Sequence, residues 1–290
     1  MKRNRQGNII RNKRLNLLAV VGFIMMSFWL SACGVVVSKE EIVTKHAALT
    51  GFHGLELSSG FDLKVTFGQK FKVQLVGDRT ILAEHTVLEN NNGILKIGLT
   101  PYQMYTGIKT LKAIIEMPNL RSLRLSGASK AHISAWNCNE HISLRLSGAS
   151  EADVELSSES ISVKLSGASV LKGRVSVKKE ASWDLSGASH VRVNGNSETL
   201  KIEASGASVI KAAEFIADAA DIRLSGASEG MLRTRHHLDA RLSGASEVDA
   251  NVGGKLDARL SGASELRVSG SPIMGNIKTS GASHITKIVK

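Results

Sequence analysis

Few side chains in this sequence combine a type and a spacing that could do covalent chemistry. The chain has two cysteines, Cys33 and Cys138, and a cysteine thiolate is a strong nucleophile. The segments that begin at Ser169 and Ser208 have the pattern Ser-x-x-Lys. In such a segment the serine can accept an acyl group while the lysine takes its proton. Whether any of these groups is functional depends on the elements that position it.

Cys33 follows an N-terminal export signal. Residues 2–14 contain six basic side chains and no acidic one, and residues 15–30 are largely apolar. A basic segment followed by an apolar one predicts a signal peptide. The apolar run of 16 residues is shorter than the roughly 20 that span a bilayer as a helix. We therefore expect residues 1–32 to be a lipoprotein signal peptide that is removed on export.

The segment Leu30-Ser31-Ala32-Cys33-Gly34 resembles the bacterial lipobox, with a branched apolar residue and two small residues before the cysteine. The resemblance implies that Cys33 becomes the first residue of the mature protein and carries lipid, including palmitate. Several acyl chains anchor a protein stably to a membrane. Because Gly34 rather than Asp follows the cysteine, the resemblance favours an outer membrane lipoprotein, facing the periplasm or exposed on the surface.

Nine copies of the tetrapeptide Ser-Gly-Ala-Ser set the fold, and they recur every 18 to 21 residues. Apolar and polar residues alternate on both sides of each copy, as in Leu144 and Leu146. A period of two predicts strands. A repeat of about 19 residues is too short for two helices or a propeller blade. Parallel crossovers are nearly always right-handed. We therefore expect an all-β protein, a right-handed parallel β-helix (β-solenoid) of about 19-residue coils.

An irregular N-terminal capping region should precede the regular coils. Residues 55–65 resemble a degenerate first coil, and Asn91-Asn92-Gly93 predicts a hairpin turn. Terminal repeats of a solenoid are atypical because they must cover its end. We expect four segments in the chain: 1–32 signal peptide, 33–45 tether, 46–122 N-terminal coils and cap, and 123–290 Ser-Gly-Ala-Ser repeats.

In this fold we expect the candidate nucleophiles to have a structural role. The Ser-x-x-Lys pattern belongs at the start of a helix, and other repeats have Asp153, Arg192 or Asp249 at the position of the lysine. We expect the serine hydroxyls to bond to adjacent coils and no residue to be catalytic. Cys138 has no CxxC partner and no basic neighbour, which favours a structural thiol over a redox one. The adjacent His236 and His237 should point to opposite faces of a strand, and other histidines, such as His132, lie on separate coils. They predict no metal site, and we expect no cofactor.

Stacked coils align charges. Four basic residues lie two positions before successive tetrapeptides: Arg223, Arg241, Arg259 and Lys278. Three acidic residues follow successive tetrapeptides directly: Glu229, Glu247 and Glu265. In one interpretation the two ladders are solvated and bridge each other. In the other, the basic stripe binds sulfated, phosphorylated or uronic-acid polymers, such as an anionic polysaccharide or lipopolysaccharide.

The net charge of +11 does not indicate nucleic acid as a partner. Six of the 37 Lys and Arg residues lie in the signal, so the rest of the chain carries 31 basic and 26 acidic side chains. Aromatic residues make up 4% of the chain, too few for stacking platforms.

Residues 51–65, residues 92–97 and the Leu-x-Leu-Ser-Gly-Ala-Ser coils resemble the head GIN domain family of putative autotransporter adhesins. The resemblance covers roughly residues 46–290 and implies an exported β-helical protein without catalytic residues. The leading hypothesis is a non-catalytic, lipid-anchored cell-envelope protein for adhesion or polymer binding. The alternatives are a β-helical polysaccharide-active enzyme and a ligand-free structural envelope protein. An enzyme would need paired acids on long loops and exposed aromatics to stack sugars.

Overall fold

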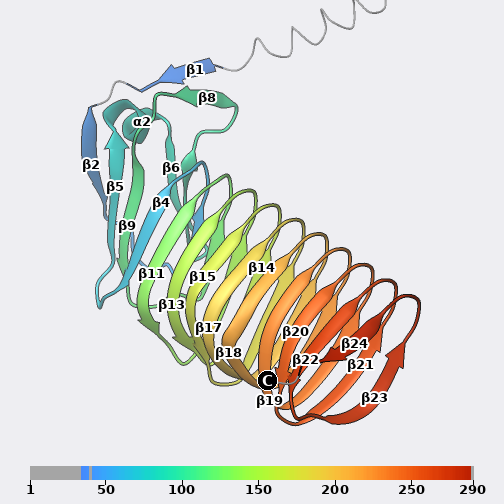
Figure 1. The fold of residues 1–290 in the computed structure, drawn as a ribbon. Coiled ribbons are helices and arrows are strands. Elements are labelled where there is room, and N and C mark those ends of the chain that lie inside the picture. The colour runs from blue at the N-terminus through green and yellow to red at the C-terminus, as the bar shows by residue number, and fades with distance from the viewer. Residues whose placement is uncertain (1–33, 39–40, 289–290) are drawn as a thin grey trace, which may run out of the picture.

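A computed structural model describes residues 34–38 and 41–288. Its main body is a β-solenoid in which every coil contributes one strand before the Ser-Gly-Ala-Ser turn and one strand after it (Figure 1). We call the preceding strands sheet 1 and the following strands sheet 2. Within each sheet, strands of adjacent coils pair in parallel. This confirms the predicted all-β solenoid with about 19 residues per coil.

The strands of sheet 1 are β3 (Gly54–Leu57), β10 (Ser122–Leu125), β12 (His141–Leu146), β14 (Ser160–Leu165), β16 (Glu180–Leu185), β21 (Lys255–Leu260) and β23 (Ile273–Thr279). The strands of sheet 2 are β4 (Asp62–Phe67), β11 (Lys130–Asn137), β13 (Glu151–Ser158), β15 (Val170–Val177), β20 (Glu247–Val252), β22 (Glu265–Gly270) and β24 (His284–Lys287). Three longer strands contribute their first part to sheet 2 and their second part to sheet 1: β17 (His190–Ala204), β18 (Val209–Leu224) and β19 (Glu229–Leu242).

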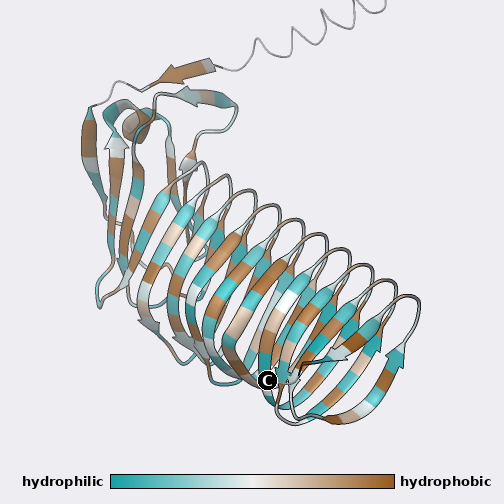
Figure 2. Ribbon diagram, in the orientation of Figure 1, coloured by the Kyte–Doolittle hydropathy of each residue, from teal (hydrophilic) through white to brown (hydrophobic). Residues whose placement is uncertain are grey.

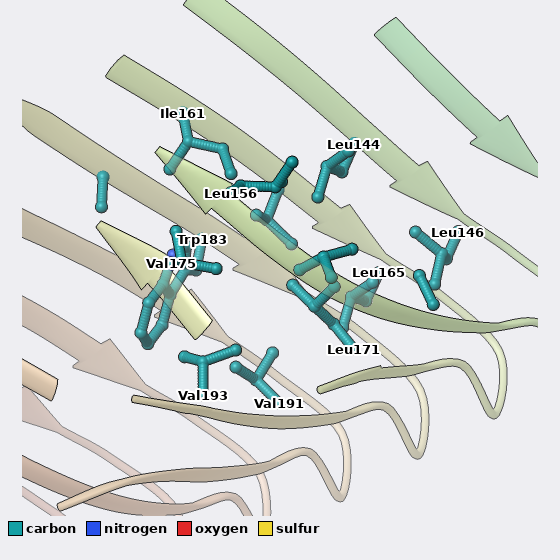
Figure 3. Packing of buried hydrophobic residues seen from close by; sticks show 14 of the residues in the cluster. Leu144, Leu146, Leu156, Ile161, Leu165, Leu171, Val175, Trp183, Val191 and Val193 are labelled. Atoms are coloured by element: carbon teal, nitrogen blue, oxygen red, sulfur yellow. The ribbon is translucent and has the colours of Figure 1, made fainter. Parts of the chain in front are cut away.

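The core lies between the two sheets, because alternate side chains of every strand point inward. The alternation is visible as bands of hydrophobic and hydrophilic residues along the strands (Figure 2). Leu146 and Leu165, which directly precede successive turns, are both buried and lie side by side in the pairing of β12 with β14 (Figure 3). Burying one such leucine contributes about 1.5–3 kcal/mol. Each coil therefore adds its own layer to one continuous core.

The turn glycines are required by the stacking itself. The tetrapeptide glycines have φ between 61° and 77°, where a Cβ is unfavourable. From Gly167 onward a Cβ would also lie 2.5–2.7 Å from the glycine carbonyl oxygen of the preceding coil. That carbonyl accepts a hydrogen bond from the alanine N–H of the next coil, as Gly187 accepts from Ala207 at 2.8 Å. The turns are thus joined by a backbone ladder.

The expected bonding of serine hydroxyls to adjacent coils is confirmed for the first serine of the tetrapeptide and is wrong for the second. The hydroxyl of the second serine in each tetrapeptide donates to the carbonyl of the first serine of the same turn, at 2.7–2.9 Å. Where the first serine reaches the preceding coil, its hydroxyl lies 3.4 Å from a backbone carbonyl. A local bond is preferred because the buried hydroxyl already meets an acceptor three residues away. The second serine therefore shapes its own turn, and the first serine adds a longer bond to the preceding coil.

The N-terminal cap does not follow sequence order. β7 (Ile94–Leu99) pairs in parallel with β3, and β9 (Leu111–Met117) pairs in parallel with β4. The other edges of β3 and β4 carry β10 and β11. The first coil in the sequence is therefore the second coil in space.

Antiparallel strands and a helix complete the cap. β5 (Lys72–Asp78) pairs with β9, β2 (Ile42–Ala47) pairs with β5, and β6 (Thr86–Asn91) pairs with β7 through the predicted hairpin turn. The short helix α2 (Arg79–Glu84) is capped by the Asp78 carboxylate and buries Ile81 and Leu82. Within the described residues, no helix is long and apolar enough to cross a bilayer.

The folded body begins before residue 46. The segment expected as a tether, residues 33–45, contains β1 (Gly34–Val37) and the first part of β2. β1 pairs in parallel with β8 (Gln103–Thr106), which extends from the cap.

Candidate functional site

The outer face of sheet 1 carries the predicted basic column. Parallel pairing places Arg223 beside Arg241, Arg241 beside Arg259, and Arg259 beside Lys278. Neighbouring strands lie about 4.8 Å apart, so the four side chains form successive rungs. The three arginines point outward because each lies between two buried residues, and Lys278 continues the column on β23, whose residues are all exposed.

These side chains line a groove of about 1170 Å³ on the surface of the solenoid. The groove spans six coils, from Asp184 to Lys278. The first serines of the tetrapeptides line it as well, and they include Ser225 and Ser243. A ligand along this groove would meet a charged group and a hydroxyl on every coil, which suits an extended polymer with a regular repeat.

The same column continues toward the N-terminus, where the sequence analysis missed it. Arg124, Arg145 and Lys164 occupy the equivalent position in earlier coils and line an adjoining groove of about 470 Å³. Their position two residues before the tetrapeptide could have revealed them. Asp184 and Glu203 lie between the two basic runs, so the column is interrupted by two acidic rungs.

The two charge ladders do not bridge each other, contrary to one of the two interpretations above. Arg223 contacts Glu203 at 2.9 Å and Asp221 at 3.1 Å. Arg241 contacts Asp239 at 2.6 Å and Asp221 at 3.5 Å. The reason is geometric, since the acidic ladder lies on sheet 2 beyond the turn. Aspartates two residues earlier in the same strand of sheet 1 are the nearer partners.

The acidic ladder of sheet 2 has its own cation. Arg267 forms ion pairs with Glu247, with Glu265 at 3.8 Å and with Asp249 at 2.5 Å. The ion pairs of Arg223, Arg241 and Arg267 thus each stay within the outer face of one sheet.

Arg259 and Lys278 differ from Arg223 and Arg241, the other two cations of the larger groove. Over residues 34–38 and 41–288, neither side chain has an ion pair or a side-chain hydrogen bond. Asp257 is the residue that corresponds to Asp221 and Asp239, but it accepts from the Lys255 ammonium at 2.8 Å and from the Asn276 backbone N–H at 2.6 Å. These two donors hold the pKa of Asp257 below its usual value. The C-terminal end of the groove therefore presents two cations that are not neutralised locally.

The Ser-x-x-Lys segments form no catalytic pair. The Ser169 hydroxyl is buried and donates to the Ser166 carbonyl at 2.8 Å, whereas the Lys172 ammonium lies on the outer face 2.6 Å from a Glu151 carboxylate oxygen. Ser208 is likewise buried and donates to the Ser205 carbonyl. A base on the opposite side of the strand cannot accept the serine proton.

The remaining candidate residues are dispersed. Cys138 is half-buried, and its thiol lies 3.7 Å from the Glu140 carbonyl oxygen. In the part of the chain that the structure describes, no three His, Cys, Asp or Glu side chains gather as a metal site. Trp136 and Trp183 are both 1% exposed and unavailable to stack against a sugar. Cys33, the predicted lipidation site, lies outside the described residues.

Comparison with protein families identifies one match. Residues 51–250 match the family model described as putative auto-transporter adhesin, head GIN domain. No curated protein matches the chain.

Several solved structures share the fold. A putative adhesin from Parabacteroides merdae aligns with a TM-score of 0.71 and 12% identity, over 89% of this chain and 100% of that chain. A putative adhesin from Parabacteroides distasonis aligns with a TM-score of 0.69 and 11% identity, over 88% and 100%. A putative lipid binding protein from the same organism aligns with a TM-score of 0.66 and 16% identity, also over 88% and 100%. At these identities the likeness concerns the fold alone.

Proposed function

Because this chain belongs to the family described as putative auto-transporter adhesin, head GIN domain, we propose that it is a non-catalytic adhesin of the cell envelope. Adhesion needs a rigid body with an accessible surface, and a solenoid with one continuous core is rigid in this sense. The structural neighbours described as putative adhesins support the same general role.

The proposed attachment is a lipid on Cys33, which would make the mature chain an outer membrane lipoprotein. The support is the lipobox-like segment and the preceding apolar run. Labelling cells with a palmitate analogue tests this, with Cys33→Ser as the control. We expect the label on the wild-type protein only. Equal labelling of the Cys33→Ser variant would contradict the assignment.

The proposed ligand is an anionic polymer, such as an acidic polysaccharide or lipopolysaccharide, in the groove of sheet 1. The observation that carries this proposal is the pair Arg259 and Lys278, which line the groove without a carboxylate partner. An unpaired cation is available to a ligand anion, whereas Arg223 and Arg241 must first leave their aspartates.

This difference gives a matched experiment. The first double variant combines Arg259→Gln with Lys278→Gln, and the second combines Arg223→Gln with Arg241→Gln. Both remove two positive charges from the same groove. Retention on heparin and on immobilised lipopolysaccharide would be compared at low salt. We expect the first pair of substitutions to weaken retention more than the second. Equal retention of both variants and the wild type would exclude the groove as the binding surface and favour a ligand-free structural role.

The enzymatic alternative has less support. A polysaccharide-active enzyme needs two carboxyl groups facing one bond and aromatic platforms. In this groove, Asp184 and Glu203 are adjacent rungs, and Lys164 and Arg223 respectively form ion pairs with them. Release of reducing ends from acidic polysaccharides by the purified chain would revive this alternative.

A further inference from the structure

β1 and β8 form a two-stranded parallel ribbon at the cap, at the end of the solenoid opposite β23 and β24 (Figure 1). Two strands alone are marginal in water. The Ser38 N–H extends the ribbon by donating to the Thr106 carbonyl of β8 at 3.0 Å. The Ser38 hydroxyl joins the ribbon to the cap by donating to the Asp78 carboxylate at 2.8 Å. The position of β1 relative to the cap is therefore defined.

Both faces of the ribbon carry apolar side chains, and the exposed face also carries Thr106, the partner of Val37. Val36 and Tyr105 are paired across the ribbon and pack against the core. Val35, Val37 and Met104 lie on the opposite face and are 60%, 62% and 52% exposed. Parallel strands are ordinarily covered on both faces. An exposed apolar face at this place indicates contact with an apolar environment other than the protein core.

We propose that this face is a membrane-contact surface, consisting of Val35, Val37, Met104 and the neighbouring Tyr102. The inference rests on the lipid anchor proposed above. Cys33 directly precedes β1, so acyl chains on its side chain and amino group would lie next to the exposed valines. Tyr102 is 90% exposed, and a tyrosine ring has the mixed polarity that suits the headgroup region. The occupant of the face is thus the bilayer that holds the anchor.

This contact would fix which end of the solenoid is presented. Ten successive strands of sheet 1 lead from β3 to β23, which at about 4.8 Å per strand gives a length of about 40 Å. Arg259 and Lys278 lie at the end farther from the ribbon. With the ribbon on the membrane, the unpaired cations of the groove lie at the membrane-distal end.

Tryptophan fluorescence tests the proposal in the full-length, acylated protein. Tyr102→Trp places a reporter on the proposed surface, and Ile273→Trp places a matched reporter on the 74% exposed side chain at the other end of the solenoid. The proteins would be reconstituted into phosphatidylethanolamine–phosphatidylglycerol vesicles with brominated acyl chains. We expect the emission of the residue 102 reporter to be blue-shifted and strongly quenched, at a depth of about 5–10 Å. The emission of the residue 273 reporter should be neither shifted nor quenched. Trp136 and Trp183 give the same background in both.

A second variant tests whether the apolar face makes the contact. Val35→Thr, Val37→Thr and Met104→Thr, in the Tyr102→Trp background, keep strand-forming side chains and remove most of the apolar surface. We expect quenching to be lost while mass spectrometry still finds acyl chains on Cys33. Acylated protein with equal quenching of the two reporters, or quenching that the triple substitution leaves unchanged, would overturn the contact but not the anchor. Absence of acyl chains would overturn both.

Discussion

Substituting one turn glycine by alanine should destabilise the solenoid more than its backbone angle alone explains. Gly206 has φ of 77°, and a Cβ there would lie 2.5 Å from the Gly187 carbonyl oxygen. The left-handed conformation costs an alanine about 1–2 kcal/mol. Relieving the overlap requires adjacent coils to separate, and overpacking of this kind costs about 1–3 kcal/mol. We therefore expect Gly206→Ala to lower the free energy of unfolding by about 2–5 kcal/mol.

Gly60 provides the matched control. Its φ is 76°, but nothing lies within 4 Å of a Cβ built there. Gly60→Ala should cost only the conformational part, about 1–2 kcal/mol. Urea unfolding of the two variants, followed by circular dichroism, measures the difference, and hydrogen exchange of the Ala207 N–H reports the separation of the coils locally. Equal destabilisation by the two substitutions would refute the argument that stacking, rather than the angle, requires glycine.

Two further predictions concern charge. Lys172→Met should return the pKa of Glu151 to its ordinary value, because the Lys172 ammonium holds it below that value. A lowered folded-state pKa means that the pair stabilises fully above about pH 4.3 and loses its effect as the pH falls through the folded-state value, which NMR titration of the two proteins would detect. Asp239→Asn should strengthen heparin retention about two- to fivefold by releasing Arg241. Asp257→Asn removes the same charge without releasing a groove cation, so a gain as large as that of Asp239→Asn would contradict the role given to Arg241.

The regular coils could be predicted from the sequence because each one repeats the same short sequence pattern. Alternating residues before and after each tetrapeptide define two strands, and a glycine at φ near 70° defines the turn between them. Stacking then follows without further information, since every strand meets a copy of itself. The outward column from Arg223 to Lys278 was predictable for the same reason.

The cap could not be predicted in this way. Its central contact joins β3 to β7, which are about 40 residues apart and do not resemble each other in sequence. In the turn between β3 and β4, the irregular neighbouring coil leaves room for a side chain where the regular coils need glycine. Ser59 occupies the place of the turn glycine with φ of 64°, and the Leu99 N–H of the coil stacked on it donates to the Ser59 hydroxyl at 3.3 Å. An irregular neighbour accommodates a side chain that an identical coil would exclude.

The charge partners depend on differences between columns rather than on the repeat. Asp221, Asp239 and Asp257 form one column beside the basic column, and from sequence alone each would neutralise the arginine two residues later. The coil of Asp257 differs because Lys255 stands where the preceding coil has His237. An ammonium that donates at 2.8 Å competes successfully for the carboxylate, and Arg259 is left without it. Since Lys278 has no carboxylate two residues earlier either, where Asn276 stands, the available positive charge gathers at the C-terminal end of the groove. A repeat that is uniform in fold is therefore not uniform in binding capacity.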